Sequence, residues 1–397
     1  MGQNAGKDRR IDGMGVRQRI IEEKKDILLT AVIPVYNGER HLRNTLKHIT
    51  QIECQEMEVL LIDDGSSDQS SVICRKYEEH DRRIRYVRQS NQGVAKTRNR
   101  GIELARGEYI CFWDQDDCVI PDGLFKLLHE IQSEHAQMGM FSTGRMIRGR
   151  ISVYESIRDG VYSGEEARRQ LLYPLLFRGY RYPFIDTGNY LYGSVWKCIF
   201  RTDFVRDRKI RFRKFVNYED DWIFVTQALS CADKVAAVSE MGYCWRVNER
   251  SESHKGTYIE NLTERFEALD QYVLDYLSDS MKDRAVLAEY RRVSLCEHYV
   301  DLYRNDANIR NATDRENNRR KCRESVRKYL LETDYMRQLT CRKYLKRSAY
   351  RRQVILNSLR YGGIEITYMI SRLYDRLEEG MSRVQWIVHL ERRRKMK

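Results

Sequence analysis

The sequence has little proline, no long apolar run and no paired-cysteine motif. Its 397 residues include four prolines, all before residue 184, so the second half can form uninterrupted helices. No stretch approaches the roughly 18 apolar residues that cross a bilayer, which excludes an integral membrane protein. The first 26 residues contain no apolar segment typical of a secretory signal. The ten cysteines lack C-x-x-C or zinc spacing, and reduced thiols in the cytoplasm are the simplest interpretation.

The formal charge of +13 is concentrated at the two ends of the chain. Residues 341–397 carry fifteen Lys/Arg against five Asp/Glu, and residues 1–26 carry seven against five. The part between them is therefore close to neutral. Because a nucleic-acid groove needs a basic stripe through the folded body, we expect no nucleic-acid partner.

Between residues 27 and 141 the chain repeats a short apolar run, a polar turn and an amphipathic helical stretch. The runs lie at 28–35, 57–62, 84–87, 109–113 and 138–141. This rhythm predicts βαβ units and a parallel, doubly wound α/β sheet, followed by a mainly helical C-terminal region. We expect a solvated leader (1–26), a nucleotide-binding transferase-type domain (27–255, with halves 27–140 and 141–255), and a helical region (256–397) with a basic tail (341–397).

Carboxylates follow two of the predicted strands. Asp63 and Asp64 follow the second, and Asp114, Asp116 and Asp117 follow the fourth. The carboxyl ends of parallel strands meet at one edge of a sheet, where ligands bind. Crowded carboxylates without His or Cys favour Mg²⁺ or Mn²⁺ bridging a nucleotide diphosphate. The alternative is that this acidic run caps the helix that starts near residue 121.

The segment 91–99 occupies the junction between the third strand and a helix. Its small residues, with Gly93, offer backbone N–H groups to an anion, and Lys96 and Arg98 add positive charge. We interpret it as a pyrophosphate contact, the alternative being an ordinary solvated helix start. Tyr36, at the end of the first strand, is either a packing residue or a face on which a base stacks.

These motifs, in this order, resemble glycosyltransferase family 2. The motifs are Val32–Asn37, Ile62–Asp68, Asn91-x-Gly93 with Arg98-Asn99, Gly107–Ile110 and Asp114-x-Asp116-Asp117. The resemblance implies a GT-A fold, a nucleotide-diphospho-sugar donor, UDP-linked by preference, and inversion at the anomeric carbon. It places Asp114 and Asp116 at the metal. The donor pocket it implies consists of Pro34, Tyr36, Glu39, Asp63, Asp64, Gly93, Lys96, Arg98, Asp114 and Gln115.

The later part resembles bacterial polysaccharide members of that family more loosely. Residues 218–222 resemble their Glu-Asp motif, with Asp220 the favoured catalytic base and Glu219 and Asp221 beside it. The extra Asp221 leaves the choice between the two aspartates open, and a helix-start charge pair is the alternative. Arg246 lies in an aromatic-Arg segment that closes the domain, and His254 follows it as a further metal ligand or an ordinary exposed histidine.

Sugar transfer needs a base for the acceptor hydroxyl and positive charge beside the departing diphosphate. A carboxylate must take the proton of the acceptor hydroxyl as it attacks the sugar carbon, and Asp220 is assigned that role. The metal, with Arg98 and Arg246, offsets charge on the departing diphosphate. An acceptor wall is expected in the aromatic stretch 180–196 and beside the Glu-Asp motif, with core packing as the alternative; its residues are Tyr182, Tyr190, Trp196 and Trp222.

The basic tail suggests a peripheral location on the inner face of the cell membrane, close to a glycan or lipid-linked acceptor. Residues 364–373 form an apolar stripe that suits an interfacial helix, or packing on the body or on a second copy in a homodimer. A nucleotidyltransferase and a non-catalytic binding protein are the alternatives to a glycosyltransferase. A nucleotidyltransferase would need a Gly/Lys/Arg-rich triphosphate loop near the first strand, and a non-catalytic binding protein would use only the basic ends.

Overall fold

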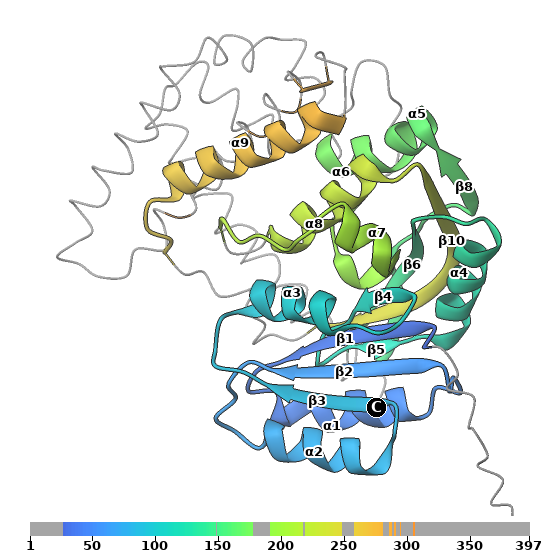
Figure 1. Ribbon diagram of the computed structural model, residues 1–397, viewed down its shortest axis with the longest axis vertical. Helices are drawn as coiled ribbons and strands as arrows, with labels where there is room; N and C mark the ends of the chain where they lie inside the picture. The colour runs from blue at the N-terminus through green and yellow to red at the C-terminus, as the bar shows by residue number, and fades with distance from the viewer. Residues whose placement is uncertain are drawn as a thin grey trace, which may run out of the picture.

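The computed structural model describes residues 27–147, 149–177, 191–216, 219–247 and 258–280, with the single residues 286, 287, 290, 294 and 305. The leader, the tail 341–397, Tyr182, Tyr190 and His254 lie outside the described residues. Mixed helices and strands alternate along the chain (Figure 1). Among the described helices, none is long and apolar enough to cross a membrane.

The first half contains the predicted βαβ units. All five predicted strands are present, four with bounds within one residue of those expected, while the fifth, β6, extends six residues further than expected. The elements are β1 (Leu29–Val35), α1 (Glu39–Thr50), β2 (Met57–Asp63), α2 (Ser70–His80), β3 (Ile84–Arg88), α3 (Val94–Leu104), β4 (Tyr109–Phe112), β5 (Cys118–Val119), α4 (Pro121–Ser133) and β6 (Met138–Ile147).

The second half adds shorter strands and the helices α8 and α9. The elements are β7 (Arg150–Glu155), β8 (Gly160–Ser163), α5 (Gly164–Ala167), a π-helical turn (Arg168–Leu172), α6 (Tyr173–Phe177), a 3₁₀ turn (Val195–Lys197), β9 (Cys198–Arg201), α7 (Thr202–Asp207), α8 (Asp220–Cys231), β10 (Lys234–Arg246) and α9 (Leu262–Ser280).

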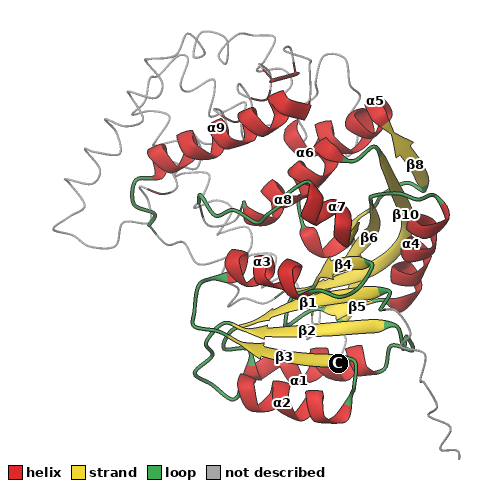
Figure 2. Ribbon diagram, viewed as in Figure 1, coloured by secondary structure: helices red, strands yellow, loops and turns green. Residues whose placement is uncertain are grey.

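The strands form one sheet in the order β3-β2-β1-β4-β9-β6-β10-β5, with β7 beside β6 and β8 beside β10 (Figure 2). Strands β3, β2, β1 and β4 are parallel, as predicted. β9, which lies after the region of the predicted βαβ units, enters between β4 and β6 and is antiparallel to both, so the complete sheet is mixed. The four residues of β9 carry no sequence signal for the direction of the strand, because the connecting segment sets that direction.

Helices cover both faces of the sheet, so the doubly wound arrangement is confirmed (Figure 1). Side chains of β1 alternate between the faces. Ala31 and Ile33 pack with α1, α2 and α4 on one face, and Val32 packs with α3 and α8 on the other. The α3 helix approaches closely because Gly101 has no Cβ, which would lie 2.3 Å from Val32 Cγ1.

The buried side of α9 is an apolar stripe. Phe266, Leu269, Val273 and Leu277 are buried and belong to the same apolar cluster as Phe224 of α8. The first helix after the expected boundary at residue 255 therefore shares its core with the sheet domain. Among the described cysteines all seven are free thiols.

Candidate active site

The loops that follow β1 and β4 are joined by one side chain. The Gln115 amide donates to the Tyr36 carbonyl at 3.0 Å, and the Tyr36 N–H donates back to Gln115 Oε1 at 3.1 Å. Gly38 provides space for this contact, since a Cβ there would lie 2.1 Å from Gln115 Oε1. Both bonds involve only the backbone of Tyr36, and the residue remains 49% exposed at the edge of the site. Pro34, half-buried, precedes it in β1.

The two aspartates at the end of β2 support loops rather than presenting free carboxylates. Asp63 is fully buried and accepts hydrogen bonds from the Ser66 N–H at 2.8 Å and the Tyr86 hydroxyl at 2.7 Å. Asp64 accepts the N–H groups of Gln92 and Gly93 at 2.9 and 2.8 Å. Two of the amides interpreted as a pyrophosphate contact, those of Gln92 and Gly93, are therefore bonded to Asp64.

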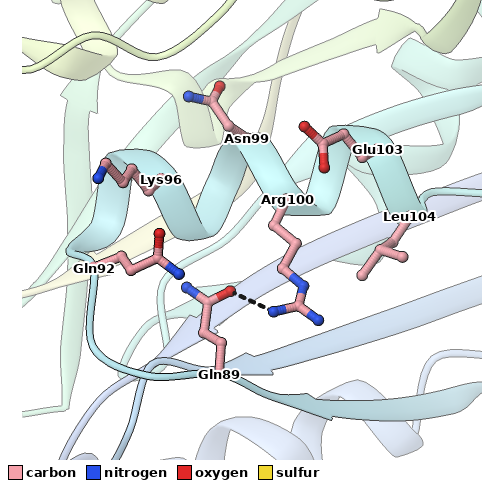
Figure 3. A pocket seen from close by; sticks show the side chains of 7 residues that line it. All are labelled: Gln89, Gln92, Lys96, Asn99, Arg100, Glu103 and Leu104. Carbon is pink, nitrogen blue, oxygen red and sulfur yellow. Dashed lines mark hydrogen bonds between the residues drawn. The ribbon is translucent and has the colours of Figure 1, made fainter.

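Gly93 and Lys96 have local roles in the same loop. Gly93 is the N-cap residue of α3 and has a φ of 87°, a conformation that favours glycine. Lys96 lines a polar groove of about 590 Å³ along one side of α3, with Gln89, Asn99 and Arg100 (Figure 3). Arg98 bonds to groups elsewhere, so the structure separates the two cations that the sequence suggested would act together.

Glu39 is also engaged within the protein. Its carboxylate accepts the Gln69 N–H at 3.0 Å, while Asp68 accepts the Glu39 N–H at 3.0 Å. This reciprocal pair satisfies backbone donors at the starts of α1 and α2. The structure thus gives Glu39 a helix-capping contact.

The acidic loop after β4 is held from β10. The Tyr243 hydroxyl accepts the Asp114 N–H and donates to the Asp117 carboxylate, both at 3.0 Å. Arg246 donates its N–H to Asp117 at 2.8 Å and its guanidinium Nε to the Asp116 carbonyl at 2.9 Å. The alternative in which this loop caps the next helix is wrong, because α4 has Ile120 as its N-cap residue and no side-chain cap bond.

Two carboxylates of this loop, Asp116 and Asp117, have raised pKa values. Burial, together with the charge of Asp114, raises the pKa of Asp116 to about 6. Burial also raises the pKa of Asp117 well above its ordinary value, and Asp114 and Asp116 add to the shift. Asp116 makes no ion pair with any described side chain. A cation beside Asp116 would relieve this crowding.

Arg98 joins the acidic loop to α8. Its guanidinium bonds Asp114 at 2.9 Å, Asp220 at 3.2 Å and Asp221 at 2.6 Å, while its Cζ lies 5.3 Å from the centre of the Phe212 ring. Burial opposes the charge of Arg98, but the three carboxylates outweigh it and raise its pKa. One buried cation therefore lies among three carboxylates from both halves of the domain.

The two candidate bases differ in how many of their oxygens are occupied. Asp221 accepts Arg98 on Oδ1 and the Val195 N–H, at 3.3 Å, on Oδ2. Asp220 accepts Arg98 on Oδ2, and among the described residues nothing bonds its Oδ1. Burial raises the pKa of Asp221 to about 7, with Arg98 opposing the shift and Asp220 adding to it. Glu219 precedes both as the N-cap residue of α8.

The two tryptophans predicted for the acceptor wall are core residues instead. Trp196 is 8% exposed and stacks on Tyr243 at a ring distance of 4.9 Å. Trp222 is 7% exposed, and its indole N–H donates to the Leu175 carbonyl at 3.2 Å. The alternative of core packing is therefore the one that holds for both.

An aromatic cluster lies near the acidic loop, and one of its members, Tyr192, belongs to the stretch 180–196 in which the acceptor wall was expected. Tyr154 of β7 stacks on Tyr192 at 4.9 Å and lies 5.7 Å from Trp245 of β10, and Tyr192 is 36% exposed. Trp245 immediately precedes Arg246, and Tyr192 is three residues before Val195, which bonds Asp221. Period-two alternation along β7 and β10 was the only signal that could have placed these rings together.

The donor set of the site fits a hard divalent cation. Among the described residues, no three His, Cys, Asp or Glu side chains are grouped to hold a metal alone. Asp116, with its raised pKa and no cation partner, and Asp114 beside it supply oxygen ligands only. Mg²⁺ or Mn²⁺ commonly binds through one or two carboxylates and completes its shell with phosphate oxygens and water.

Comparison with known proteins agrees with this geometry. Residues 30–192 match the profile of the family described as glycosyl transferase family 2. The chain is 26% identical over 315 residues to the uncharacterized glycosyltransferase EpsJ of Bacillus subtilis, covering 78% of this chain and 85% of that protein. It is 28% identical over 263 residues to the succinoglycan biosynthesis protein ExoO of Rhizobium meliloti, covering 64% and 72%.

A solved structure shows the same fold. Residues 1–349 of S. aureus TarS, in complex with UDP-GlcNAc, match with a TM-score of 0.61 and 18% identity, over 88% of this chain and 92% of that one. The profile match, the relatives and the fold agree with the site. Residues 30–192 therefore form a domain of the glycosyl transferase family 2 type, and the chain has a GT-A fold and is a glycosyltransferase.

Proposed function

We propose that the protein is an inverting enzyme that transfers a sugar from a UDP-sugar to a hydroxyl of a glycan or lipid-linked acceptor in polysaccharide biosynthesis. The observation that carries the proposal is the bonding of Asp114, Asp220 and Asp221 to one arginine, Arg98. This bonding brings the loop after β4, which is proposed to bind the diphosphate and the metal, into one site with a candidate base. The relative ExoO, named for succinoglycan biosynthesis, supports the pathway.

A UDP-sugar is favoured as the donor for two reasons. TarS, which shares the fold, was solved in complexes with UDP-GlcNAc and with UDP. In this chain the half-exposed ring of Tyr36 lies at the edge of the site, where it offers a stacking face for a base. Asp63, Asp64, Glu39 and Gln115 contribute by fixing the loops around that face.

Asp220 is our choice of general base. Its Oδ1 has no partner among the described residues, whereas both oxygens of Asp221 are occupied. The pKa of Asp221 alone would favour Asp221, but a base must first present a free oxygen to the proton that it takes. Asp220 would accept the acceptor hydroxyl proton as that oxygen attacks the sugar carbon from the face opposite the diphosphate. Asp221 then acts as a positioning residue for Arg98.

Mn²⁺ or Mg²⁺ would be held by Asp116 and Asp114. When bound, the ion offsets negative charge on the departing diphosphate. Arg246 supports this site indirectly, because its bonds to Asp116 and Asp117 fix the loop. Nucleotidyl transfer and simple binding, the two other functions weighed, are disfavoured by the match of residues 30–192 to a glycosyltransferase family.

The acceptor sugar is proposed to lie against Tyr154, Tyr192 and Trp245. Flat ring faces suit the apolar face of a pyranose, and the contacts described above connect this cluster to Asp221 and to Asp116. The proposed location is cytoplasmic and peripheral, on the inner face of the membrane.

Donor binding is tested by the shift in melting temperature that UDP causes with and without Mn²⁺. We expect a rise that requires the metal, is lost in Asp116→Ala and is reduced in Tyr36→Ala. The exposed Asp122→Ala in α4 is the matched control and should respond like the wild type. An equal rise in Asp116→Ala would contradict the assigned metal site.

A further inference from the structure

The end of the β6–β7 hairpin exposes apolar side chains. We call the described residues 145–147 and 149–153 the hairpin tip. Ile147, Ile151 and Val153 are 45%, 51% and 63% exposed. Ile147 is paired with Arg150 and Met146 with Ile151, so the strands stay paired up to the turn. A folded hairpin therefore presents large apolar groups to solvent, an arrangement that usually marks a contact surface.

The outer edge of β7 adds to this exposure. The strand pairs with β6, and among the described residues no strand pairs with its other side. Soluble proteins protect such edges with charged side chains, lysine above all, or with proline. Residues 145–153 contain no proline and no charged side chain other than arginine, so positive charge alone protects this edge.

The hairpin tip is positively charged. Residues 145–150 include three arginines, and residues 143–153 include no acidic residue. Arg145 and Arg150 are exposed. The next acidic residue, Glu155, is buried against Lys197. Exposed apolar side chains on both faces of the hairpin, next to arginines that form no ion pair with a described acidic side chain, complement a surface that is apolar inside and negative outside.

The hairpin tip lies at the edge of the sheet that carries the site. β6 is parallel to β10, and Met146 is paired with Arg246, whose N–H bonds Asp117. The Val247 N–H donates to the Met146 carbonyl at 3.0 Å. The residues beyond Met146 therefore extend past the level at which β10 ends and the acidic loop begins.

We propose that the hairpin tip is a membrane-docking element that inserts Ile147 and Ile151 into the interface of an anionic phospholipid bilayer. The arginines contact lipid phosphates, and the edge of β7 is shielded there. This deepens the proposed function and rests on it in one respect, because docking at this edge brings the site to an acceptor anchored in lipid. The binding itself requires no sugar donor.

Flotation of the full-length protein with vesicles tests the docking. The vesicles are phosphatidylcholine with about 30% phosphatidylglycerol, compared with phosphatidylcholine alone. We expect binding to the anionic vesicles, reduced at least about tenfold in Ile147→Ser/Ile151→Ser and reduced in Arg145→Gln/Arg150→Gln. Val72→Ser, which removes a 56% exposed side chain from α2, is the matched control and should bind as the wild type does.

Hydrogen exchange locates the contact. We expect vesicle-induced protection in peptides covering residues 143–155, with the melting temperature of the double serine variant unchanged. Equal vesicle binding by wild type and that variant would overturn the proposal and assign binding to another segment. A dimer of the wild type that the serine substitutions dissociate, without a change in vesicle binding, would also overturn it in favour of a second copy.

The outcome is separable from that of the proposed function. Release of UDP from a UDP-sugar with a water-soluble acceptor measures catalysis without vesicles. The double serine variant should keep that activity within about twofold, because its substitutions lie outside the site. Absence of vesicle binding by a protein with normal turnover would show that the docking proposal fails. Vesicle binding by a protein without turnover would show that the proposed function fails.

Discussion

Arg98 and Asp221 are 123 residues apart in the chain, yet Arg98 Nη1 lies 2.6 Å from Asp221 Oδ1. The same guanidinium bonds Asp114 through its other terminal nitrogen. The contact therefore joins the loop after β4 to the first turn of α8. Since the pair is shielded from solvent, its loss leaves carboxylates facing one another without a compensating charge.

Arg98→Lys should impair the enzyme although it preserves the charge. A lysine ammonium carries its donors on one atom and lacks the planar fork with which the two terminal nitrogens of Arg98 reach Asp114 on one side and the α8 aspartates on the other. We expect kcat to fall by about 10²-fold and the free energy of unfolding by about 1–3 kcal/mol. Steady-state kinetics and denaturant titration measure the two effects. Arg100→Lys, on the same helix beside Gln89, is the control and should change neither; equal behaviour of both variants would show that Arg98 has no special role.

Asp220→Asn and Asp221→Asn distinguish the two candidate bases. We expect Asp220→Asn to lower kcat by roughly 10²–10⁴-fold with little change in the dissociation constant of the donor. Asp221→Asn should have the smaller effect on kcat, because an asparagine can still accept a hydrogen bond from Arg98. The reverse ranking in single-turnover measurements would assign the base to Asp221.

Asp221→Asn should also change how stability depends on pH. The pKa of Asp221 is about 7 in the folded protein and about 3.9 in an unfolded chain. Between these values the folded state holds a proton that the unfolded state has released, so the stability contribution of Asp221 falls as pH rises. The melting temperature of the variant relative to wild type should therefore increase from about pH 4 to about pH 7, then level off. A constant difference would contradict the raised pKa.

The buried pair of Lys197 and Glu155 should contribute to stability only as a pair. Lys197 Nζ lies 2.7 Å from both oxygens of Glu155, and the Tyr192 N–H donates to the same carboxylate. We expect Lys197→Met to lower the unfolding free energy by about 3–5 kcal/mol, with partial recovery in the double variant Glu155→Gln/Lys197→Met.

Lys126→Met is the control for this prediction. It breaks the exposed pair with Glu240 and should lower the free energy of unfolding far less than Lys197→Met does, because solvent screens both charges. Chemical denaturation of the four proteins measures the differences. A loss in Lys197→Met as small as that in Lys126→Met would show that the buried pair is not a stabilising element.

The βαβ half was predictable because its signals are local. Apolar runs such as 57–62 and the polar residues that end them fix both the strands and the edge where ligands bind. The orientation of β9 was not predictable, because strand direction depends on a connection that the apolar pattern does not describe. The family resemblance located Asp114, Asp116 and Asp220.

The role of each carboxylate could not be read from the sequence. Asp63 and Asp64 have the same residue type and setting as Asp114, yet their oxygens are taken by backbone N–H groups and a tyrosine hydroxyl. The burial of individual aromatic residues could not be read from the sequence either. Trp196 is buried by Tyr243, 47 positions later in the sequence, while Trp245 two residues beyond that tyrosine joins the half-exposed cluster.

The central claim, donor turnover at the Asp116–Asp220 site, is tested most directly by release of nucleoside diphosphate. The purified protein would be incubated with a panel of nucleotide sugars and Mn²⁺ or Mg²⁺, beside Asp116→Ala, Asp220→Ala and the control Asp122→Ala. The account predicts metal-dependent release of UDP from one UDP-sugar, lost in the first two variants and kept in the third. Release that persists in Asp116→Ala and Asp220→Ala, or no release from any donor, would contradict it.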